Sequence, residues 1–482
     1  MRLSEILKGV DVLGCTANLN QEIVGVCADS RQVQPGWLFV ASTAYGADRH
    51  AYLPVAARLG AAAAVCCCPP EEPMPYVLVS DTALAEAQIA ANWYGHPADR
   101  MKLTGITGTN GKTTVTYLLK TILEQTLGVK VGLIGTMQNL IGSQSLPTSN
   151  TTPGAMELQA LLHRMAQEGC THVVMEVSSH ALALDRVAGL AFETAVFTNL
   201  TEDHLDFHKT MQAYGEAKAL LFERCRQAVL NADDPAWEQM AAHFDGQPLT
   251  YGQHPAAALR AADAMLAADH VSFTAQLGGR SVPVRLGIPG GFTVYNALAA
   301  LGAAHTLGVP LEAAAAALAQ AHGVKGRVEV VPTPGQPYTI LIDYAHTPDG
   351  LENVLRSVRG FAGGRVVAVF GCGGDRDPVK RPIMGRIAAR LADFVVVTSD
   401  NPRTEEPGSI IRQILEGMQD TATPYVVVEN RREAIRWAMD HAQAGDIIVL
   451  AGKGHETYQI IGTEKTHLDE REEVAHHLAT KE

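Results

Sequence analysis

The stretch GITGTNGKTTV, residues 105–115, decides the fold of this part of the chain, because it joins a strand pattern to a helix pattern through a glycine turn. Its Gly111-Lys112-Thr113 matches the end of the general phosphate-binding pattern G-x-x-x-x-G-K-[ST]. Ile106 stands where the first glycine of that pattern should be. The loop is therefore a compact variant, G-x-x-G-K-T-T.

Such a loop binds phosphate for a physical reason. Backbone N–H groups and a helix N-terminus surround the phosphate oxygens, a lysine reaches the terminal phosphates, and a threonine hydroxyl can bind Mg²⁺. The alternative is a plain glycine turn with an incidental lysine, which the flanking strand and helix patterns disfavour. The sequence predicts an ATP or GTP site at Gly108, Thr109, Asn110, Gly111, Lys112, Thr113 and Thr114.

Strand-like runs alternate with helical stretches through residues 102–234. The runs are KLTGITG, VKVGLIGT, THVVMEVSS, TAVFTNL and QAVLNADD. This alternation is typical of βαβ units, so it predicts a parallel sheet covered by helices. An alanine-rich helix at 311–320 separates this series from a second one: YTILIDYA, GRVVAVFGCGG, ADFVVVTSD, PYVVVEN and DIIVLAGKG.

At 482 residues the chain is too long for one hydrophobic core, and we predict an α/β protein of three domains. Residues 1–98 form a small α/β domain of short strands and an alanine-rich helix. Residues 99–325 form a central domain with the phosphate loop and a parallel sheet flanked by helices. Residues 326–482 form a Rossmann-like α/β domain, and Gly326 marks the boundary.

Composition excludes several classes of partner. The net charge of −13 and a pI near 5.8 argue against nucleic acid or an anionic membrane surface. The start, MRLSEILKGVDVLG, has no signal-peptide pattern, and no apolar run approaches the roughly 20 residues of a membrane span. We expect a cytoplasmic monomer without membrane insertion.

The cysteines give no sign of a disulfide framework or a zinc site. There are 8, three of them consecutive at 66–68, and none forms a C-x-x-C pair. We expect reduced, mostly buried thiols.

Two further residues are candidates for binding magnesium. Glu176 ends the run THVVMEVSS, and His204 follows another run in TNLTEDHLDFH. Each alone would be an ordinary structural residue. Because the carboxyl ends of parallel strands open into the ligand crevice, we expect both beside the phosphate loop.

Several motifs occur together and in order: GTNGKTT, the TTP of 151–153, EVSSHAL, TNLTEDHLDFH, GEAKALLF, YNALAA, DYAHTPD and GCGGDRD. With these motifs the whole chain resembles the Mur ligases, the ATP-dependent amide-forming enzymes of peptidoglycan precursor synthesis. It is most similar to the members that add the third residue of the peptide. The compact phosphate loop is shared by Mur ligases and folylpolyglutamate synthases.

The resemblance implies that a carboxylate is activated as an acyl phosphate, which an amine then attacks. Lys112 and Mg²⁺ would offset the repulsion between the carboxylate and the γ-phosphate. By resemblance, Thr113 and Glu176 belong to one Mg²⁺ site, and His204 to a second one with a carbamylated Lys218. Without the resemblance, Lys218 reads as a solvated lysine.

The resemblance also implies UDP-N-acetylmuramoyl-L-alanyl-D-glutamate as the acceptor. Ser30 in Asp29-Ser30-Arg31 matches the uridine pocket. Two departures weaken this match: the stretch 43–53 lacks the HQA of some relatives, and Leu184 replaces a glutamine. The positions matched to the muramoyl peptide are Asn150, Thr151, Thr152, Ser178 and Arg186.

The segment Asp400-Asn401-Pro402-Arg403 predicts which amino acid is added. The planar fork of an arginine pairs with a carboxylate through two hydrogen bonds, so a side chain ending in a carboxylate fits and lysine is repelled. The resemblance points the same way, to meso-diaminopimelate. An Asx-Pro turn without a binding role is the alternative. The other matched positions of this pocket are Arg376, Gly452 and Glu456.

Further ATP contacts are expected from the second series of strands and the helix before it. They are Asn296, Arg327, Asp343 and His346. Three other functions stay open at this point. They are a lysine-adding Mur ligase, a folylpolyglutamate synthase, and a nucleotide-dependent switch without ligase activity.

Overall fold

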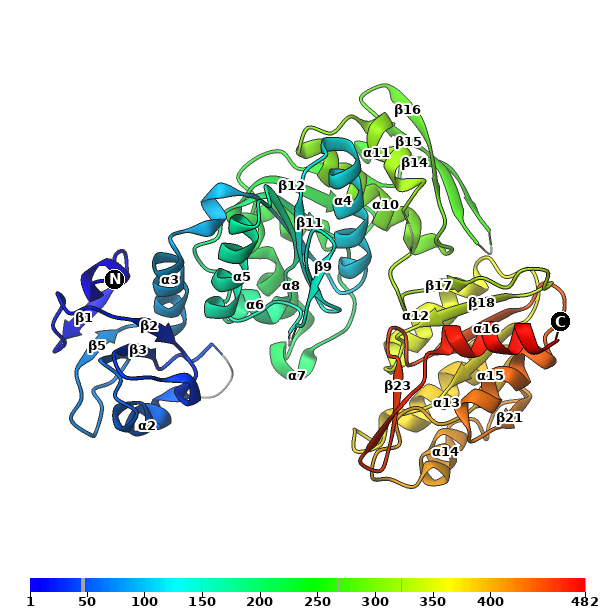
Figure 1. Cartoon of the computed structure of the whole chain (residues 1–482). Helices are drawn as coiled ribbons and strands as arrows, with labels where there is room; N and C mark the ends of the chain where they lie inside the picture. The colour runs from blue at the N-terminus through cyan, green and yellow to red at the C-terminus, as the bar shows by residue number, and fades with distance from the viewer. Residues whose placement is uncertain (45–47, 149, 268, 322, 482) are drawn as a thin grey trace. The chain divides into compact units, whose positions relative to one another are not determined.

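The computed structural model describes residues 1–44, 48–148, 150–267, 269–321 and 323–481. Two compact units divide the chain (Figure 1): Met1–Arg260 with Leu298–Ala317, and Ala261–Ala297 with Leu318–Glu482. Both units consist of sheets with packed helices, which confirms the predicted α/β class. The division into three domains stays a prediction. In the described part of the chain, no helix combines the length and the apolar character that crossing a membrane requires.

The first unit begins with a sheet of order β1-β5-β4-β3-β2. Strands β2 to β5 are parallel, and β1 pairs antiparallel with β5. Helices α1 (Leu3–Ile6) and α3 (Thr82–Tyr94) cover one face and α2 (Leu53–Arg58) the other, so consecutive strand residues are apolar. The strands are β1 (Val12–Cys15), β2 (Gly25–Cys27), β3 (Trp37–Val40), β4 (Ala63–Cys66) and β5 (Tyr76–Val79).

The main sheet of the first unit has the order β13-β12-β11-β6-β10-β7-β8-β9. It is parallel from β13 to β7, as predicted, and ends in the antiparallel strands β8 and β9, which were not predicted. Helix α4 (Lys112–Leu127) packs on β6, β7 and β10. The strands are β6 (Lys102–Thr107), β7 (Val131–Ile134), β8 (Asn139–Ile141), β9 (Gln144–Leu146), β10 (His172–Glu176), β11 (Phe192–Phe197), β12 (Cys225–Asn231) and β13 (Leu249–Gly252).

The strand order brings three loops to one edge of this sheet. Strand β6 lies between β10 and β11, with Glu176 opposite Ile106 and Phe197 opposite Thr107. The loops that follow β6, β10 and β11 therefore leave the same edge side by side. This is the switch point at which open parallel sheets bind ligands.

The second unit contains the rest of β14 (Leu259–Leu266), whose first residues pair with β13, and the antiparallel strands β15 (Val271–Leu277) and β16 (Arg280–Leu286). The sequence analysis did not predict these strands. Helix α10 (Gly291–Thr306) follows them. The alanine-rich helix was correctly predicted and is α11 (Leu311–Leu318).

The C-terminal sheet has the order β17-β18-β22-β19-β20-β21 and is parallel except for β17. Helices α12 (Pro348–Arg359), α13 (Lys380–Leu391) and α14 (Pro407–Glu416) pack on one face. Helices α15 (Arg431–Asp440) and α16 (Glu470–Lys481) pack on the other (Figure 1). The strands are β17 (Glu329–Val331), β18 (Thr339–Asp343), β19 (Val366–Phe370), β20 (Phe394–Val397), β21 (Tyr425–Val427) and β22 (Ile447–Ala451), and a β23–β24 hairpin (Tyr458–Ile461, Glu464–His467) follows.

All eight cysteines lie among the described residues and are free thiols, as expected. Their expected burial is only partly correct. Four are buried and one is intermediate, but Cys15, Cys67 and Cys68 are exposed.

Candidate active site

The phosphate loop connects β6 to α4 through two glycines with positive φ. Gly108 has φ 141° and Gly111 has φ 87°, a region that favours glycine. A Cβ on Gly108 would lie 1.9 Å from Thr198 Oγ1, so no other residue fits there. Lys112 Nζ donates to the carbonyl oxygens of Gly108 and Thr109, at 2.8 and 2.7 Å. The ammonium therefore lies against the loop at the start of α4.

The segment after β11 fixes the shape of this loop. Asn110 N donates to Asn199 Oδ1 at 2.9 Å, and Thr198 Oγ1 donates to Asn110 O at 2.6 Å. Thr109 N donates to Asn199 O at 2.8 Å. The loop is thus preorganised by residues almost 90 positions later in the sequence.

The two residues predicted to share a magnesium ion lie in contact. Thr113 Oγ1 donates to Glu176 Oε1 at 3.0 Å, and both side chains are buried. Thr136, which the sequence analysis did not identify, donates to the same carboxylate from its backbone N and its hydroxyl, at 2.9 and 3.0 Å. A Cβ on Gly135 would lie 2.4 Å from Glu176 Oε1, so a glycine leaves room for this carboxylate.

Lys218 is buried, with a relative exposure of 1%, so its interpretation as a solvated lysine is wrong. Its Nζ donates to Gly108 O at 2.9 Å and lies 4.3 Å from the centre of the Tyr214 ring. Burial, and then the positive charge of Lys112, hold the pKa of Lys218 well below its usual value. The amine therefore lies at the phosphate loop, in surroundings that favour its uncharged form.

His204 follows β11 and lies at one end of a group of aromatic rings. Its ring centre is 4.8 Å from that of His180 and 6.1 Å from that of Tyr214. His208, which is buried, completes the group and shares a hydrogen bond of 2.9 Å with Ser179 Oγ. Burial, and then His180, lower the pKa of His208 to about 4, so its ring is neutral. His180 and His208 were not predicted as site residues, although both lie in motifs quoted above.

Most residues predicted to bind the muramoyl peptide adjoin one another. Thr152 Oγ1 accepts from Ser178 N at 3.0 Å, and Arg186 Nη1 donates to Thr152 O at 3.3 Å. Thr151 and the exposed Asn150 directly precede Thr152. Hydroxyls, an amide and a guanidinium form a surface that suits an oxygen-rich anion.

Ser30 lies apart from these residues in the sequence, at the carboxyl end of β2. It is buried in a short helix, η1 (Ser30–Gln32), that Asp29 caps. Arg31 Nη2 pairs with Asp29 Oδ2 at 2.6 Å, and this hydrogen bonding lowers the pKa of Asp29 to about 2.

In the second unit, the predicted amino-acid pocket is held by a buried polar network. Asn401 Nδ2 donates to Glu456 Oε2 at 3.0 Å, and buried Lys453 Nζ donates to Asn401 Oδ1 and Glu456 Oε2, at 3.1 and 3.2 Å. Glu456 thus has an ammonium partner within the chain. Within the described residues, Asp400 Oδ2 is buried without a hydrogen-bond partner. A Cβ on Gly452 would lie 2.8 Å from this oxygen.

Arg403 and Arg376 flank the glycine-rich loop after β19. Arg403 Nη1 donates to Gly374 O at 2.7 Å, and its backbone N donates to Ile460 O at 3.1 Å. A Cβ on Gly373 would lie 3.1 Å from Arg403 Nη1 and 3.8 Å from Arg376 Cγ. The Arg403 guanidinium and the aliphatic part of the Arg376 side chain therefore lie beside the same glycine.

A further arginine, not predicted, joins the two loops of this pocket. Arg381 is buried and forms two hydrogen bonds of 2.8 Å with the carboxylate of Glu405, which follows Arg403 in sequence. Its Nη2 also donates to Gly373 O at 3.2 Å. Asp375 N in turn donates to Glu405 Oε1 at 2.6 Å.

Three of the four additional ATP candidates surround one aromatic ring. Arg327 Cζ lies 5.5 Å from the centre of the Tyr344 ring, and the ring of His346 lies 4.5 Å from it. Asp343 directly precedes Tyr344 and is buried, which raises the pKa of its carboxyl group, while Arg327 opposes this shift. Asn296 is buried on α10.

Comparisons with known proteins identify the family to which the chain belongs. Residues 106–304 match the Mur ligase middle domain, and residues 326–454 match the domain described as "Mur ligase, glutamate ligase domain". A UDP-N-acetylmuramoyl-L-alanyl-D-glutamate--2,6-diaminopimelate ligase of Caldanaerobacter subterraneus is 48% identical over 487 residues, which cover 100% of both chains. The chain belongs to the Mur ligase family.

Solved Mur ligase structures share this fold. A structure of a UDP-N-acetylmuramoyl-L-alanyl-D-glutamate--2,6-diaminopimelate ligase has a TM-score of 0.74 and 32% identity, covering 100% of this chain and 99% of its own. A MurF ligase from Thermotoga maritima in complex with ADP has a TM-score of 0.61 and 18% identity, covering 95% of this chain and 98% of its own. At that identity the likeness shows the fold alone.

Within this Mur ligase, the phosphate loop, Thr113, Glu176 and Lys218 lie at one sheet edge, as the sequence predicts. The sequence analysis missed Thr136, Arg381 and Lys453. Thr136 and Lys453 stand at the ends of the quoted runs VKVGLIGT and DIIVLAGKG, where a strand-end polar residue could have been noticed. Arg381 lies outside the quoted motifs.

Proposed function

We propose that this Mur ligase uses ATP to join meso-2,6-diaminopimelate to UDP-N-acetylmuramoyl-L-alanyl-D-glutamate, giving the UDP-linked tripeptide of peptidoglycan precursor synthesis. The observation that carries the proposal is the similarity over the full chain to a ligase of that name. In this proposal residues 1–98 bind the uridine end, residues 99–325 hold ATP, and residues 326–482 hold the amino acid.

The phosphate-loop residues act on the triphosphate. Backbone N–H groups of the loop and the start of α4 bind the phosphates, and Lys112 offers a positive charge next to them. The acceptor carboxylate attacks the γ-phosphorus, ADP leaves, and an acyl phosphate forms. The amine then attacks the acyl carbon and phosphate leaves.

Magnesium fits the oxygen donors at this edge. Thr113 Oγ1 and Glu176 Oε1 are 3.0 Å apart, and Mg²⁺ prefers hydroxyl, carboxylate and phosphate oxygens. When bound, the ion would neutralise charge that develops in phosphoryl transfer. His204 and the carbamate of Lys218 are the proposed holders of a second ion. Thr136 positions the Glu176 carboxylate through two hydrogen bonds.

The proposed amino-acid pocket recognises the two ends of diaminopimelate by charge. Arg403 and Arg376 offer guanidinium groups to the distal carboxylate. Glu456 is the proposed partner of an ammonium, whereas the buried Oδ2 of Asp400 already lies 4.0 Å from Arg431 Nη1. Lysine has no distal carboxylate and would bring an ammonium to the arginines.

The proposed cellular setting follows from the substrates. ATP and a UDP-linked peptide are highly charged and do not cross a membrane unaided, so an enzyme that uses both acts in the cytoplasm. All proposed site residues come from one chain, and we propose a monomer, which light scattering of the purified protein would test by its mass.

One assay separates this function from the alternatives. Purified protein receives ATP, Mg²⁺ and UDP-N-acetylmuramoyl-L-alanyl-D-glutamate with a panel of amino acids while phosphate is monitored. We expect phosphate release that requires both the dipeptide and diaminopimelate. Equal release with lysine would indicate a lysine-adding enzyme, release with a folate acceptor a folylpolyglutamate synthase, and release without an amine a nucleotide switch.

Replacing the proposed magnesium ligand should change the metal requirement. Glu176→Gln keeps the shape of the side chain but removes the charge from a buried group in contact with Thr113. We expect the Mg²⁺ concentration for half-maximal rate to rise about tenfold or more. Glu124→Gln, on the far end of α4, should leave it unchanged. An unaltered Mg²⁺ dependence of Glu176→Gln would remove Glu176 from the metal site.

Carbamylation of Lys218 predicts a chemical rescue. A carbamate forms only from an uncharged amine, and burial favours that form of Lys218. Lys218→Ala should lose most of its activity, and high concentrations of a short carboxylic acid should restore part of it by supplying the missing anion. Lys112→Ala should not be rescued, because the group lost there is a cation. Full activity of Lys218→Ala without added acid would contradict the proposal.

A further inference from the structure

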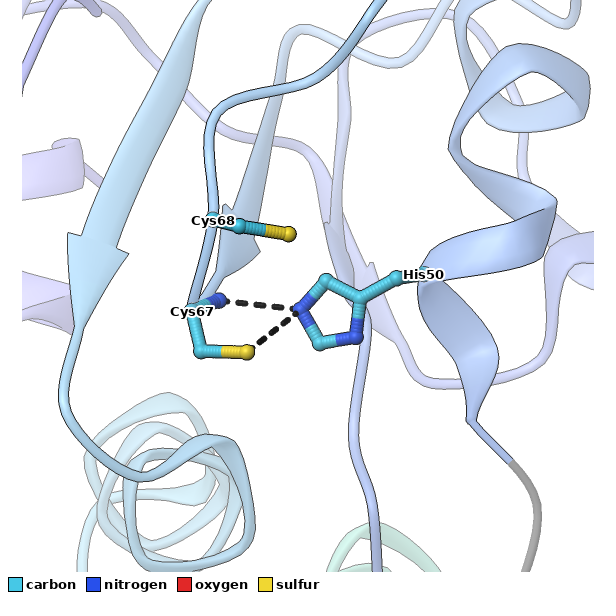
Figure 2. A group of neighbouring side chains, drawn as sticks. All are labelled: His50, Cys67 and Cys68. Carbon is cyan, nitrogen blue, oxygen red and sulfur yellow. Dashed lines mark hydrogen bonds between the residues drawn. The ribbon is translucent and has the colours of Figure 1, made fainter.

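Three possible metal ligands meet at one edge of the N-terminal sheet (Figure 2). His50 belongs to the short helix η2 (Arg49–Tyr52), and Cys67 and Cys68 directly follow β4. Cys66, the last residue of β4, is buried in the cluster beneath α2. Because the strand ends there, the next two thiols leave the core and are exposed.

The donor atoms are close enough to share one ion. His50 Nε2, Cys67 Sγ and Cys68 Sγ all lie within 4.8 Å of one another, and Nε2 is 3.3 Å from Cys67 Sγ. Tetrahedral zinc, with its usual bond lengths, separates nitrogen from sulfur by about 3.6 Å and sulfur from sulfur by about 3.8 Å. Small side-chain rotations therefore suffice to convert the observed group into a coordination shell.

The histidine is held in the tautomer that a metal requires. Asp48 Oδ1 accepts from His50 Nδ1 at 2.6 Å and from His50 N at 2.9 Å. The ring proton is thus on Nδ1, and the Nε2 lone pair faces the cysteines, where it now accepts from Cys67 N at 2.9 Å. A carboxylate behind a histidine in this way is the usual support of a metal-binding imidazole.

We propose that His50, Cys67 and Cys68 bind one thiophilic divalent cation of the Zn²⁺ type, with a fourth coordination position open to solvent. The ion would replace the thiol protons, so that two protons are released for each ion bound. Two sulfurs and one imidazole favour Zn²⁺, Co²⁺ or Cd²⁺ over Mg²⁺. This site does not share residues with the proposed magnesium site. A bound ion would link η2 to the residues that follow β4.

The spacing of the ligands explains why no zinc-binding motif is recognisable in the sequence. The two cysteines are adjacent rather than in a C-x-x-C pair, and His50 precedes Cys67 by 17 positions. Only the parallel pairing of β3 and β4 brings the two segments together. Burial, and then the neighbouring Cys68, raise the pKa of the Cys67 thiol, so binding should weaken as the pH falls.

Cobalt spectroscopy of the full chain tests the site. Metal-free protein, reduced with a thiol-free reductant, is titrated with Co²⁺ in the visible and near ultraviolet. We expect a thiolate-to-cobalt charge-transfer band and tetrahedral d–d bands that saturate at one ion per chain and vanish when Zn²⁺ is added. The proposed magnesium ligands contain no sulfur and cannot produce the charge-transfer band.

Matched variants show which residues bind the cobalt ion that gives the charge-transfer band. His50→Gln, Cys67→Ser and Cys68→Ser should each weaken Co²⁺ binding about tenfold or more, while Cys15→Ser, another exposed cysteine of the same sheet, should not. Absence of the band in the reduced parent would overturn the proposal. So would Co²⁺ affinity and band intensity that stay at the parent's values in both Cys67→Ser and Cys68→Ser, or a band that disappears in Cys15→Ser.

Discussion

Lys112→Met is expected to lower kcat/KM for ATP-dependent amide formation about 10³-fold, equivalent to about 4 kcal/mol of transition-state stabilisation. The side chain lies at the start of α4, with its ammonium 2.8 Å from Gly108 O and 2.7 Å from Thr109 O. An anionic carboxylate must approach an anionic phosphate there, and methionine retains the length of lysine without its charge. The measurement is phosphate release at saturating diaminopimelate.

A matched control lies on the same helix. Lys120 pairs with Glu124 at 2.6 Å, two turns beyond the phosphate loop. Lys120→Met should keep kcat/KM within about twofold, because its ammonium lies two helical turns away from the loop and pairs with Glu124 instead. If Lys112→Met retained activity comparable to Lys120→Met, the phosphate loop would have no catalytic role and the proposed mechanism would fail.

Arg403→Ala is expected to reduce the preference for diaminopimelate over lysine about 10²-fold. A charge-assisted pair with a carboxylate contributes about 3 kcal/mol, and removal of the guanidinium also ends its repulsion of the lysine ammonium. The measurement is the ratio of kcat/KM for the two amino acids, with each varied at saturating ATP and acceptor. We expect most of the loss in KM for diaminopimelate.

The positive φ of Arg403 makes a second variant necessary, because alanine is strained in this conformation. Arg403 has φ 52°, a left-handed conformation that asparagine tolerates better than alanine. Arg403→Asn should therefore show the same change in preference with less disturbance of the loop. Arg412→Ala, which removes an exposed arginine of α14, is the control that should keep the parent's ratio. An unchanged ratio in both Arg403 variants would remove this residue from amino-acid selection.

Some site residues can be predicted from the sequence because they lie in one continuous motif or at the carboxyl ends of parallel strands, which share one edge of a sheet. The compact loop is a continuous stretch, and its glycines are needed for their positive φ values. Glu176 ends a strand, and the carboxyl ends of parallel strands share an edge, so its contact with Thr113 could be expected before the strand order was known. Strands such as β16, in which buried and exposed residues alternate, were not predicted because they contain no continuous apolar run.

Burial was harder to predict than position. Lys218 lies in a helix of mixed polarity and reads as solvated, yet only 1% of it is exposed. The reason is that α8 (Met211–Ala219) turns this residue toward the phosphate loop, more than 100 positions earlier in the chain. Lys453 is likewise fully buried, between Asn401 and Glu456.

The sequence by itself determined the α/β class, the compact glycine loop between β6 and α4, and the charge of the residues proposed to meet the amino acid, because each depends on neighbouring residues or on strand periodicity. Tertiary structure alone decided which polar groups touch: Thr136 with Glu176, Arg381 with Glu405, and His50 with Cys67. These contacts join segments whose separation in the chain carries no local signal. They form only when strand pairing and helix packing bring the segments together and exclude water from the groups between them.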